Sequence, residues 1–254
     1  MKQIMLIAIK EFRSKLLSPI GFMSISALMV LSGFFFFSLV QQCNSLLQEA
    51  PKFPGSGVSA QKVIAIPMMK SIEIITLIAL PALISGAIAT ERTKGTLELL
   101  FSYPISSLEI ILGKFLGSYL VAIVLLLAMF LFPLSLTFVS NVPFLPLLSG
   151  LLGQALFTAA IVAISICCSS IFKDVVTAGI TSTIACLLLF LIDAPAESFR
   201  SSIRTLLDYL SLANHTDLFS YGVITSSDTV YFLTLTATLL YFSVRKIEKL
   251  REGR

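Results

Sequence analysis

The chain has 254 residues, of which 56% are hydrophobic and only 13% are charged, and its formal net charge is +4. Soluble domains carry roughly 25% charged residues, so the composition excludes a soluble globular protein. With a mean hydropathy of +0.95, it predicts an all-α integral membrane protein. The four cysteines form no CxxC pair and three lie in apolar runs, which favours packing roles over a metal site or a disulfide framework.

The chain opens with a charged amphipathic segment. Residues 2–17 carry apolar side chains at four-residue steps beside basic ones, which predicts an N-terminal interfacial helix on the cytoplasmic leaflet. The apolar run behind it predicts a first span over 20–40. This run is too long for a cleaved signal peptide and lacks a small-residue cleavage site. Prolines and glycines then predict an external loop from Asn44 to Gln61.

The remaining apolar runs supply five more spans, since a helical span needs about 20 apolar residues. The longest run is divided by the prolines and the asparagine of Ser140–Pro146, which interrupt a helix. Pro81 and Gly86 are expected to kink the second span. We place these spans at 72–90, 108–139, 147–172, 175–192 and 229–244, so that residues 1–254 form a single transmembrane domain.

The distribution of basic residues predicts the orientation. With six spans, thirteen of the 18 lysine and arginine residues fall on the side that holds both termini. The positive-inside rule then gives an N-in and C-in topology. On the external side, Lys70 and Glu73 lie one turn apart and are expected to satisfy each other. The external segment 193–228 predicts short amphipathic helices before span six, and we interpret its His215 as a solvated or capping residue.

The most polar interruption of the apolar pattern lies between spans two and three. Gly95 permits a chain reversal there, Leu97 and Leu100 contribute to an apolar face, and Pro104 ends a short helix over 94–104. An ordinary cytoplasmic hairpin loop is the simpler reading. It does not explain an apolar face in so charged a segment.

Span three begins with two recognisable motifs. Ser106 and Glu109 form an S-x-x-E capping box directly before the apolar run. Gly113 and Gly117 make a GxxxG step, which allows close approach of another helix but is common in membrane proteins.

The run E-x3-G-T-x-E-L-L-x3-P from Glu91 to Pro104, with Pro81 before it and ILGKF after it, resembles the signature of type-2 ABC transporter permeases. The C-terminal run LSLANHTDLFSYGVITSSDTVYFLTLTATLL is similar to the final external helix and last span of the gliding-motility and copper-processing branch. Thr90 and Tyr103 depart from the pattern, where an acidic and a small residue are expected.

The resemblance implies a multi-pass permease that pairs with a second permease copy in a bacterial inner membrane and exports a substrate. Two copies of a separate ABC ATPase, which uses ATP and Mg, would bind its cytoplasmic face. The helix over 94–104 would be the coupling helix that docks into the ATPase. The coupling residues that the resemblance implies are Glu91, Gly95, Thr96, Leu97, Glu98, Leu99, Leu100 and Pro104.

Several chemistries are not expected in this chain. It has no G-x4-GK[ST] loop, so it is not expected to hydrolyse ATP or to hold a cofactor. Its single histidine argues against a metal site, and span centres nearly free of charge argue against proton coupling. Its partners are membrane lipids and proteins, with no nucleic acid. Two alternatives stay open, an assembly or remodelling factor driven by a partner ATPase without solute transport, and a standalone channel or carrier.

Overall fold

The computed structural model describes residues 2–49, 59–97, 105–139, 143–194 and 201–252. Within these ranges the chain is helical and contains no strand. Five helical segments are long and apolar enough to cross a membrane, and α8 (Val175–Leu191) is a shorter apolar helix of 17 residues. The five are α2 (Pro19–Glu49), η2 with α3 and α4 (Gln61–Thr93), α6 (Ser107–Val139), α7 (Phe144–Ile171) and α11 (Ser226–Glu252). The multi-pass, all-α class predicted from composition is confirmed.

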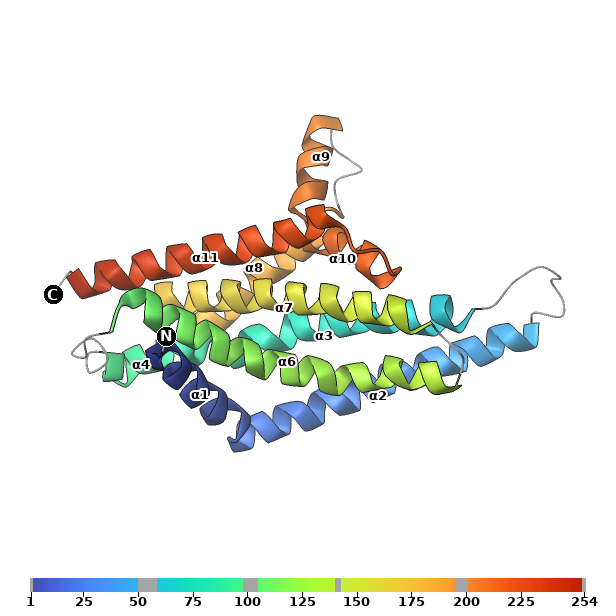
Figure 1. The fold of residues 1–254 in the computed structure, drawn as a ribbon, viewed down its shortest axis with the longest axis horizontal. Helices are drawn as coiled ribbons and strands as arrows, with labels where there is room; N and C mark the ends of the chain where they lie inside the picture. Colours follow the sequence, from blue (N-terminus) through green and yellow to red (C-terminus); the bar gives the residue numbers. More distant parts are fainter. Residues whose placement is uncertain (1, 50–58, 98–104, 140–142, 195–200, 253–254) are drawn as a thin grey trace.

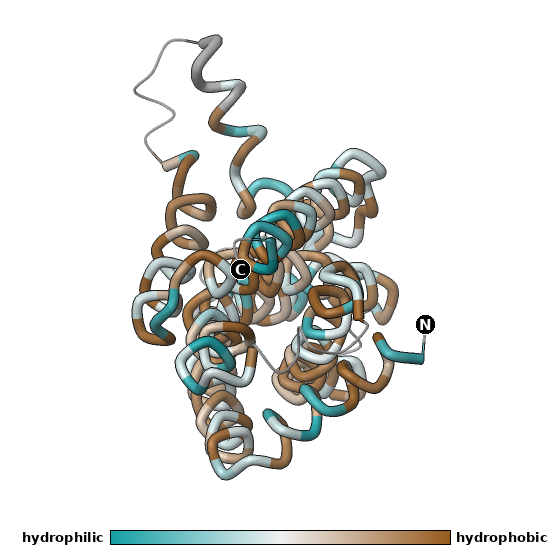
Figure 2. Tube along the Cα trace, turned by 90° about the vertical axis from the view of Figure 1, so that its left-hand side faces the viewer, coloured by the Kyte–Doolittle hydropathy of each residue, from teal (hydrophilic) through white to brown (hydrophobic). Residues whose placement is uncertain are grey.

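The long helices lie side by side in one elongated bundle (Figure 1). Both ends of the chain lie at the same end of this bundle, together with α1 (Lys2–Leu16) and α4 (Gly86–Thr93). We call it the terminal end. Seen from there, the bundle is mostly hydrophobic, and hydrophilic residues are scattered over several helix ends, including the two ends of the chain (Figure 2).

Helix α7 forms the centre of the bundle and packs against α3, α6, α8, α10 and α11. Its residues Phe157 and Ile161 are completely buried. Close packing replaces the hydrophobic effect as the force that joins helices in lipid, and small residues of α7 allow it. A Cβ added to Gly153 would lie 2.5 Å from Phe219 Cβ, so only glycine permits that contact.

Two helices are longer than predicted. Helix α2 continues to Glu49, so the expected loop was wrong for its first residues from Asn44. The chain has no helix breaker before Pro51, and Cys43 is buried in a cluster with Ile64. Helix α11 likewise runs past the predicted end of span six at Val244 to Glu252, since the charged residues there are good helix formers.

The second apolar segment is broken where its proline and glycine predicted a kink. A π-helical turn, η2 (Gln61–Ala65), leads into α3 (Ile66–Ile84), and α4 starts after Ser85. Pro81 has no N–H for the carbonyl four residues earlier. Span two was predicted over 72–90, so its helix begins well before the predicted start.

The other helices lie within a few residues of their predicted positions. Helix α6 starts one residue before the predicted 108, and α7 and α8 match 147–172 and 175–192 closely. The segment before α11 contains α9 (Ser201–Leu210) and α10 (Leu212–Ser220), two short helices as its spacing predicted.

Candidate functional site

Helix α1 packs directly on α6 at the terminal end. A Cβ added to Gly113 would lie 2.7 Å from Ile7 Cβ, and one on Gly117 would lie 2.6 Å from the carbonyl oxygen of Ala8. The GxxxG step therefore does receive another helix closely, and that helix is α1. The contact buries Ala8 and brings Glu11 against α6.

Four charged side chains from three helices meet beside this contact. Lys114 of α6 is only 2% exposed, and its Nζ lies 2.8 Å from Glu91 Oε1 at the end of α4. The same Nζ donates a hydrogen bond of 2.5 Å to the carbonyl oxygen of Ala87. Glu11 of α1 lies 3.6 Å from Lys114 Nζ and 3.0 Å from Lys15 Nζ. We call Glu11, Lys15, Glu91 and Lys114 the junction network.

The junction network is balanced, with two positive and two negative side chains, which is what makes burying them tolerable. Burial alone raises the pKa of Glu11, but Lys15 and Lys114 outweigh burial and hold the pKa below its ordinary value. Burial lowers the pKa of Lys15, while Glu11 acts in the opposite direction. Glu11 is therefore ionised at neutral pH.

Helix α4 is also attached to α7. Ser169 Oγ accepts hydrogen bonds of 3.0 Å from the backbone N–H groups of Ile88 and Ala89 and donates one of 2.5 Å to the carbonyl of Ser85. The break before α4 frees these N–H groups from the helix of α3, and Ser169 satisfies two of them. Arg92 in turn donates to carbonyl oxygens at the end of α7, the nearest being Ser170 at 3.1 Å.

The expected coupling segment begins directly after α4. Gly95 has a φ of +69°, the left-handed conformation in which glycine commonly ends a helix. Thr96 is helical and exposed, and Leu97 is helical and buried. The other implied coupling residues, Glu98, Leu99, Leu100 and Pro104, lie outside the described residues.

The segment is also held where it rejoins α6. The Ser106 backbone N–H donates to Glu109 Oε2 at 3.1 Å, and the Glu109 N–H donates to Ser106 Oγ at 3.2 Å, which are the reciprocal bonds of a capping box. Arg251 near the end of α11 donates to the carbonyl of Ile105 at 3.0 Å. Residues on either side of 98–104 are thus fixed to α6, α7 and α11.

Sequence reasoning identified Glu91 but missed the residues around it. From the sequence, Lys15 and Lys114 enter only the count of basic residues on the side of the termini, and Glu11 and Ser169 receive no specific role. The available signal was the position of Lys114 seven residues into α6, because an ionisable residue inside an apolar helix points to a partner. Glu11, the partner on α1, carries no such signal, because it lies in a segment that is already rich in charged residues.

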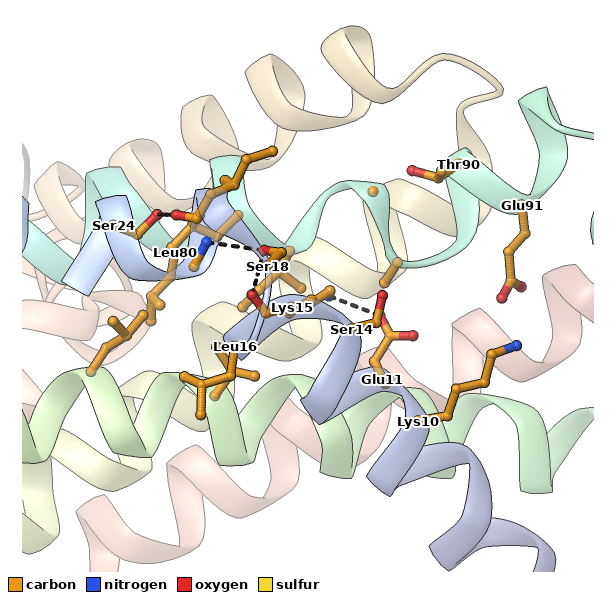
Figure 3. Close-up of a pocket in the computed structure, with 18 of the residues that line it drawn as sticks. Lys10, Glu11, Ser14, Lys15, Leu16, Ser18, Ser24, Leu80, Thr90 and Glu91 are labelled. Carbon is orange, nitrogen blue, oxygen red and sulfur yellow. Dashed lines mark hydrogen bonds and ion pairs between the residues drawn. The ribbon is translucent and has the colours of Figure 1, made fainter. Parts of the chain in front are cut away.

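A cavity of about 440 Å³ opens beside the junction network. Figure 3 shows Lys10, Glu11 and Ser14 of α1 on one side of it and Thr90 and Glu91 of α4 on the other. Residues of α2, α3 and α6, Ser18 of the turn between α1 and α2, and Lys94 and Thr96 after α4 complete the lining.

A second polar cluster lies between α3, α7 and α10. Lys70 Nζ is 3.1 Å from the fully buried Glu73 and also pairs with Asp217. The predicted pairing of Lys70 with Glu73 is confirmed. Gln154 of α7 adds a hydrogen bond of 3.2 Å to Glu73 Oε1.

The prediction for His215 was wrong. The residue is 7% exposed, its Nδ1 lies 2.7 Å from Asp228 Oδ1, and its ring stacks on Tyr231 with centroids 3.9 Å apart. The cause is the packing of α10 against α11, which sequence spacing does not reveal.

The model of the ABC-2 family transporter proteins matches residues 59–242, well over half of the chain. The chain therefore belongs to this family, whose members are membrane components of ABC transporters. The match includes α4, α6 and α7 and begins after α1 and α2. Among curated proteins, no sequence matches the chain.

Proposed function

We propose that the chain is the permease subunit of an ABC exporter in a bacterial inner membrane, driven by a separate ATPase. One observation carries this proposal beyond the family. Helix α4 is fixed to α1 and α6 by the junction network and to α7 by Ser169 and Arg92, immediately before the Gly95 turn. A force applied to the segment after Gly95 would therefore reach four helices at once.

The proposed coupling helix is the segment 94–104. Its docking residues would be those that the signature names, from Gly95 to Pro104, and Glu91 would join them to the bundle through Lys114. The contacts on both sides of the segment support this role, because a rigid attachment is what a transmitted push requires. Two copies of the ATPase, each with ATP and Mg, would bind a pair of permease chains.

The terminal end is the proposed cytoplasmic side. The excess of lysine and arginine on the side of the termini supports an N-in and C-in orientation. Helix α8 would then be span five, crossing with its 17 residues at the short limit for a helical span. The similarity of the C-terminal run supports placing the chain in the gliding-motility and copper-processing branch.

In the decisive experiment, the purified chain is reconstituted into proteoliposomes together with the ATPase that co-purifies with it. Glu98→Lys and Leu100→Asp should leave membrane insertion intact and abolish the effect of the permease on ATP hydrolysis. Lys173→Glu is the matched control, because Lys173 is exposed in the α7 to α8 turn at the same end of the bundle. Unchanged coupled activity in both coupling variants would contradict the docking role.

A transport assay separates export from the alternative. Inside-out vesicles supplied with ATP should accumulate cargo if the chain exports it. An ATPase that responds to the permease while no cargo from the cell extract accumulates would instead identify an assembly or remodelling factor. A chain that functions without any ATPase would overturn the proposal.

A further inference from the structure

The cavity beside the junction network changes in polarity along the bundle. The walls that α3 and α6 contribute are aliphatic, with Leu80, Leu83 and Val121, and Ser24 of α2 borders the same part (Figure 3). Toward the terminal end its lining becomes polar, with Lys10, Thr90 and Lys94. A cavity with an apolar interior and a charged mouth matches an amphiphile that lies along the helices.

The mouth carries excess positive charge. The two lysines and two glutamates of the junction network neutralise one another. Lys10 and Lys94 are both exposed, and neither makes an ion pair with any residue that the structure describes. Ser14 also lines the cavity and contributes a hydroxyl, whereas the Thr96 hydroxyl donates to the carbonyl of Glu91. This is a setting for an anionic group that accepts hydrogen bonds.

The length of the cavity along the bundle agrees with the thickness of one membrane leaflet. Leu80 and Lys94 are fourteen residues apart across the end of α3, the break at Ser85 and α4, so at 1.5 Å per residue they lie at most about 21 Å apart along the bundle. Half of the hydrocarbon core of a bilayer is about 15 Å thick. With Lys94 at the headgroup level, the aliphatic part of the cavity lies at the depth of acyl chains.

The turn between α1 and α2 keeps the cavity in shape. Ser18 Oγ donates to the carbonyl of Lys15 at 2.8 Å and accepts from the N–H of Gly21 at 3.0 Å. A Cβ added to Gly21 would lie 2.2 Å from the carbonyl oxygen of Lys15, so glycine is required there. The two helices are held apart as the walls of the cavity rather than packed into one another.

We propose that this cavity is a binding site for one anionic phospholipid from the leaflet at the terminal end. The phosphate binds Lys10 and Lys94, and an acyl chain lies against Leu80, Leu83 and Val121. The volume of about 440 Å³ falls within the range of about 300–1,000 Å³ for small-molecule sites. The site requires only that the terminal end lie at a membrane surface, and it stands whether or not the chain exports a solute.

The test is native mass spectrometry of the full chain in detergent, titrated with phosphatidylglycerol and, in parallel, with phosphatidylcholine. The wild type should bind one phosphatidylglycerol in preference to phosphatidylcholine. Lys10→Gln combined with Lys94→Gln should weaken phosphatidylglycerol binding about tenfold or more, since each basic residue near a headgroup contributes about a factor of five. Leu83→Trp should reduce binding of both lipids, because the indole fills the aliphatic part.

Matched controls lie outside the cavity. Lys2→Gln with Lys246→Gln removes the same number of exposed charges, and Leu148→Trp adds the same ring at an exposed position on α7. Both controls should bind phosphatidylglycerol as the wild type does. Equal binding of the two lipids by the wild type, or equal loss in the lysine variants and their control, would overturn the proposal. Neither result bears on the coupling to an ATPase, which the proteoliposome assay measures separately.

Discussion

Lys114 Nζ lies 2.8 Å from Glu91 Oε1, so the buried ammonium group of α6 pairs with a carboxylate near the C-terminal end of α4. The pair bridges the two helices on either side of the proposed coupling segment. Because Glu11 reaches the same ammonium from α1, the N-terminal helix is part of the same unit.

Replacing Lys114 by methionine should destabilise the protein. Removing one partner of a buried pair costs about 3–5 kcal/mol, and the partial exposure of Glu91 and Glu11 reduces this to about 2 kcal/mol here. That corresponds to a fall of roughly 5 °C in Tm, measured by size-exclusion chromatography after heating. Lys114→Met with Glu91→Gln should recover part of the loss. A double variant no more stable than the single one would contradict the pairing.

Replacing Gly117 by valine should detach α1 from α6. The new Cβ would lie 2.6 Å from the carbonyl oxygen of Ala8, a distance that backbone atoms cannot tolerate. Limited trypsin digestion should then cleave α1 after Lys10 and Arg13 much faster than in the wild type. Leu116→Val, at an exposed neighbouring position of α6, is the control and should digest at the wild-type rate.

Replacing Ser169 by alanine should weaken the α4 attachment. It removes the acceptor for two buried N–H groups, those of Ile88 and Ala89, at an expected loss of about 1–3 kcal/mol. Ser170→Ala is the control, because among the described residues its hydroxyl bonds only to the carbonyl of Cys167 one turn earlier. Similar melting temperatures for the two variants would show that Ser169 does not brace α4.

In the second polar cluster, Glu73→Ala should cost more than Asp217→Ala. Both carboxylates pair with Lys70, but Glu73 is fully buried and also accepts from Gln154, whereas the Asp217 side chain is 51% exposed. We expect about 2–3 kcal/mol for the buried residue and less than about 1 kcal/mol for the exposed one. The heated-sample assay used for Lys114 ranks them, and equal losses would argue against burial as the cause.

The stability should also fall in acid, in part through Glu11. Because its pKa in the folded protein lies below the ordinary value of 4.5, its contribution is fully present above pH 4.5. It is lost as the pH falls through the lower folded-state pKa. Glu11→Gln should flatten this part of the curve of Tm against pH. An unchanged acid limb in that variant would mean that other carboxylates determine it.

Most of the helix positions could be predicted from the sequence, because apolar runs and helix breakers are local signals. The break near Pro81 and Gly86, the start of α6 at its capping box and the short helices before α11 all follow from residues within a few positions. The prediction ended α2 too early because it stopped the helix where the apolar run stops. A helix can continue through polar residues until a helix breaker, and the first one after this run is Pro51.

The candidate site could be predicted from the sequence only in part, because the residues that contact one another in it are far apart along the chain. Glu91 could be singled out from its signature, but its partner Lys114 and the contribution of Glu11 depend on the packing of α1 on two glycines of α6. His215 shows the same limit, since its burial depends on Asp228 and Tyr231 from another helix. The periodicity of a single sequence shows which face of a helix is apolar, but not which other helix packs against that face.

The position of α1 has a consequence for biogenesis. Glu11 and Lys15 are made first and lie four residues apart, so they pair with each other on a new helix at the membrane surface. Glu91 and Lys114 leave the ribosome only after two further apolar segments. The N-terminal helix can therefore make its contacts with Gly117 and Lys114 only once α6, the third of the five long helical segments, has been made, so its docking follows the insertion of the first two.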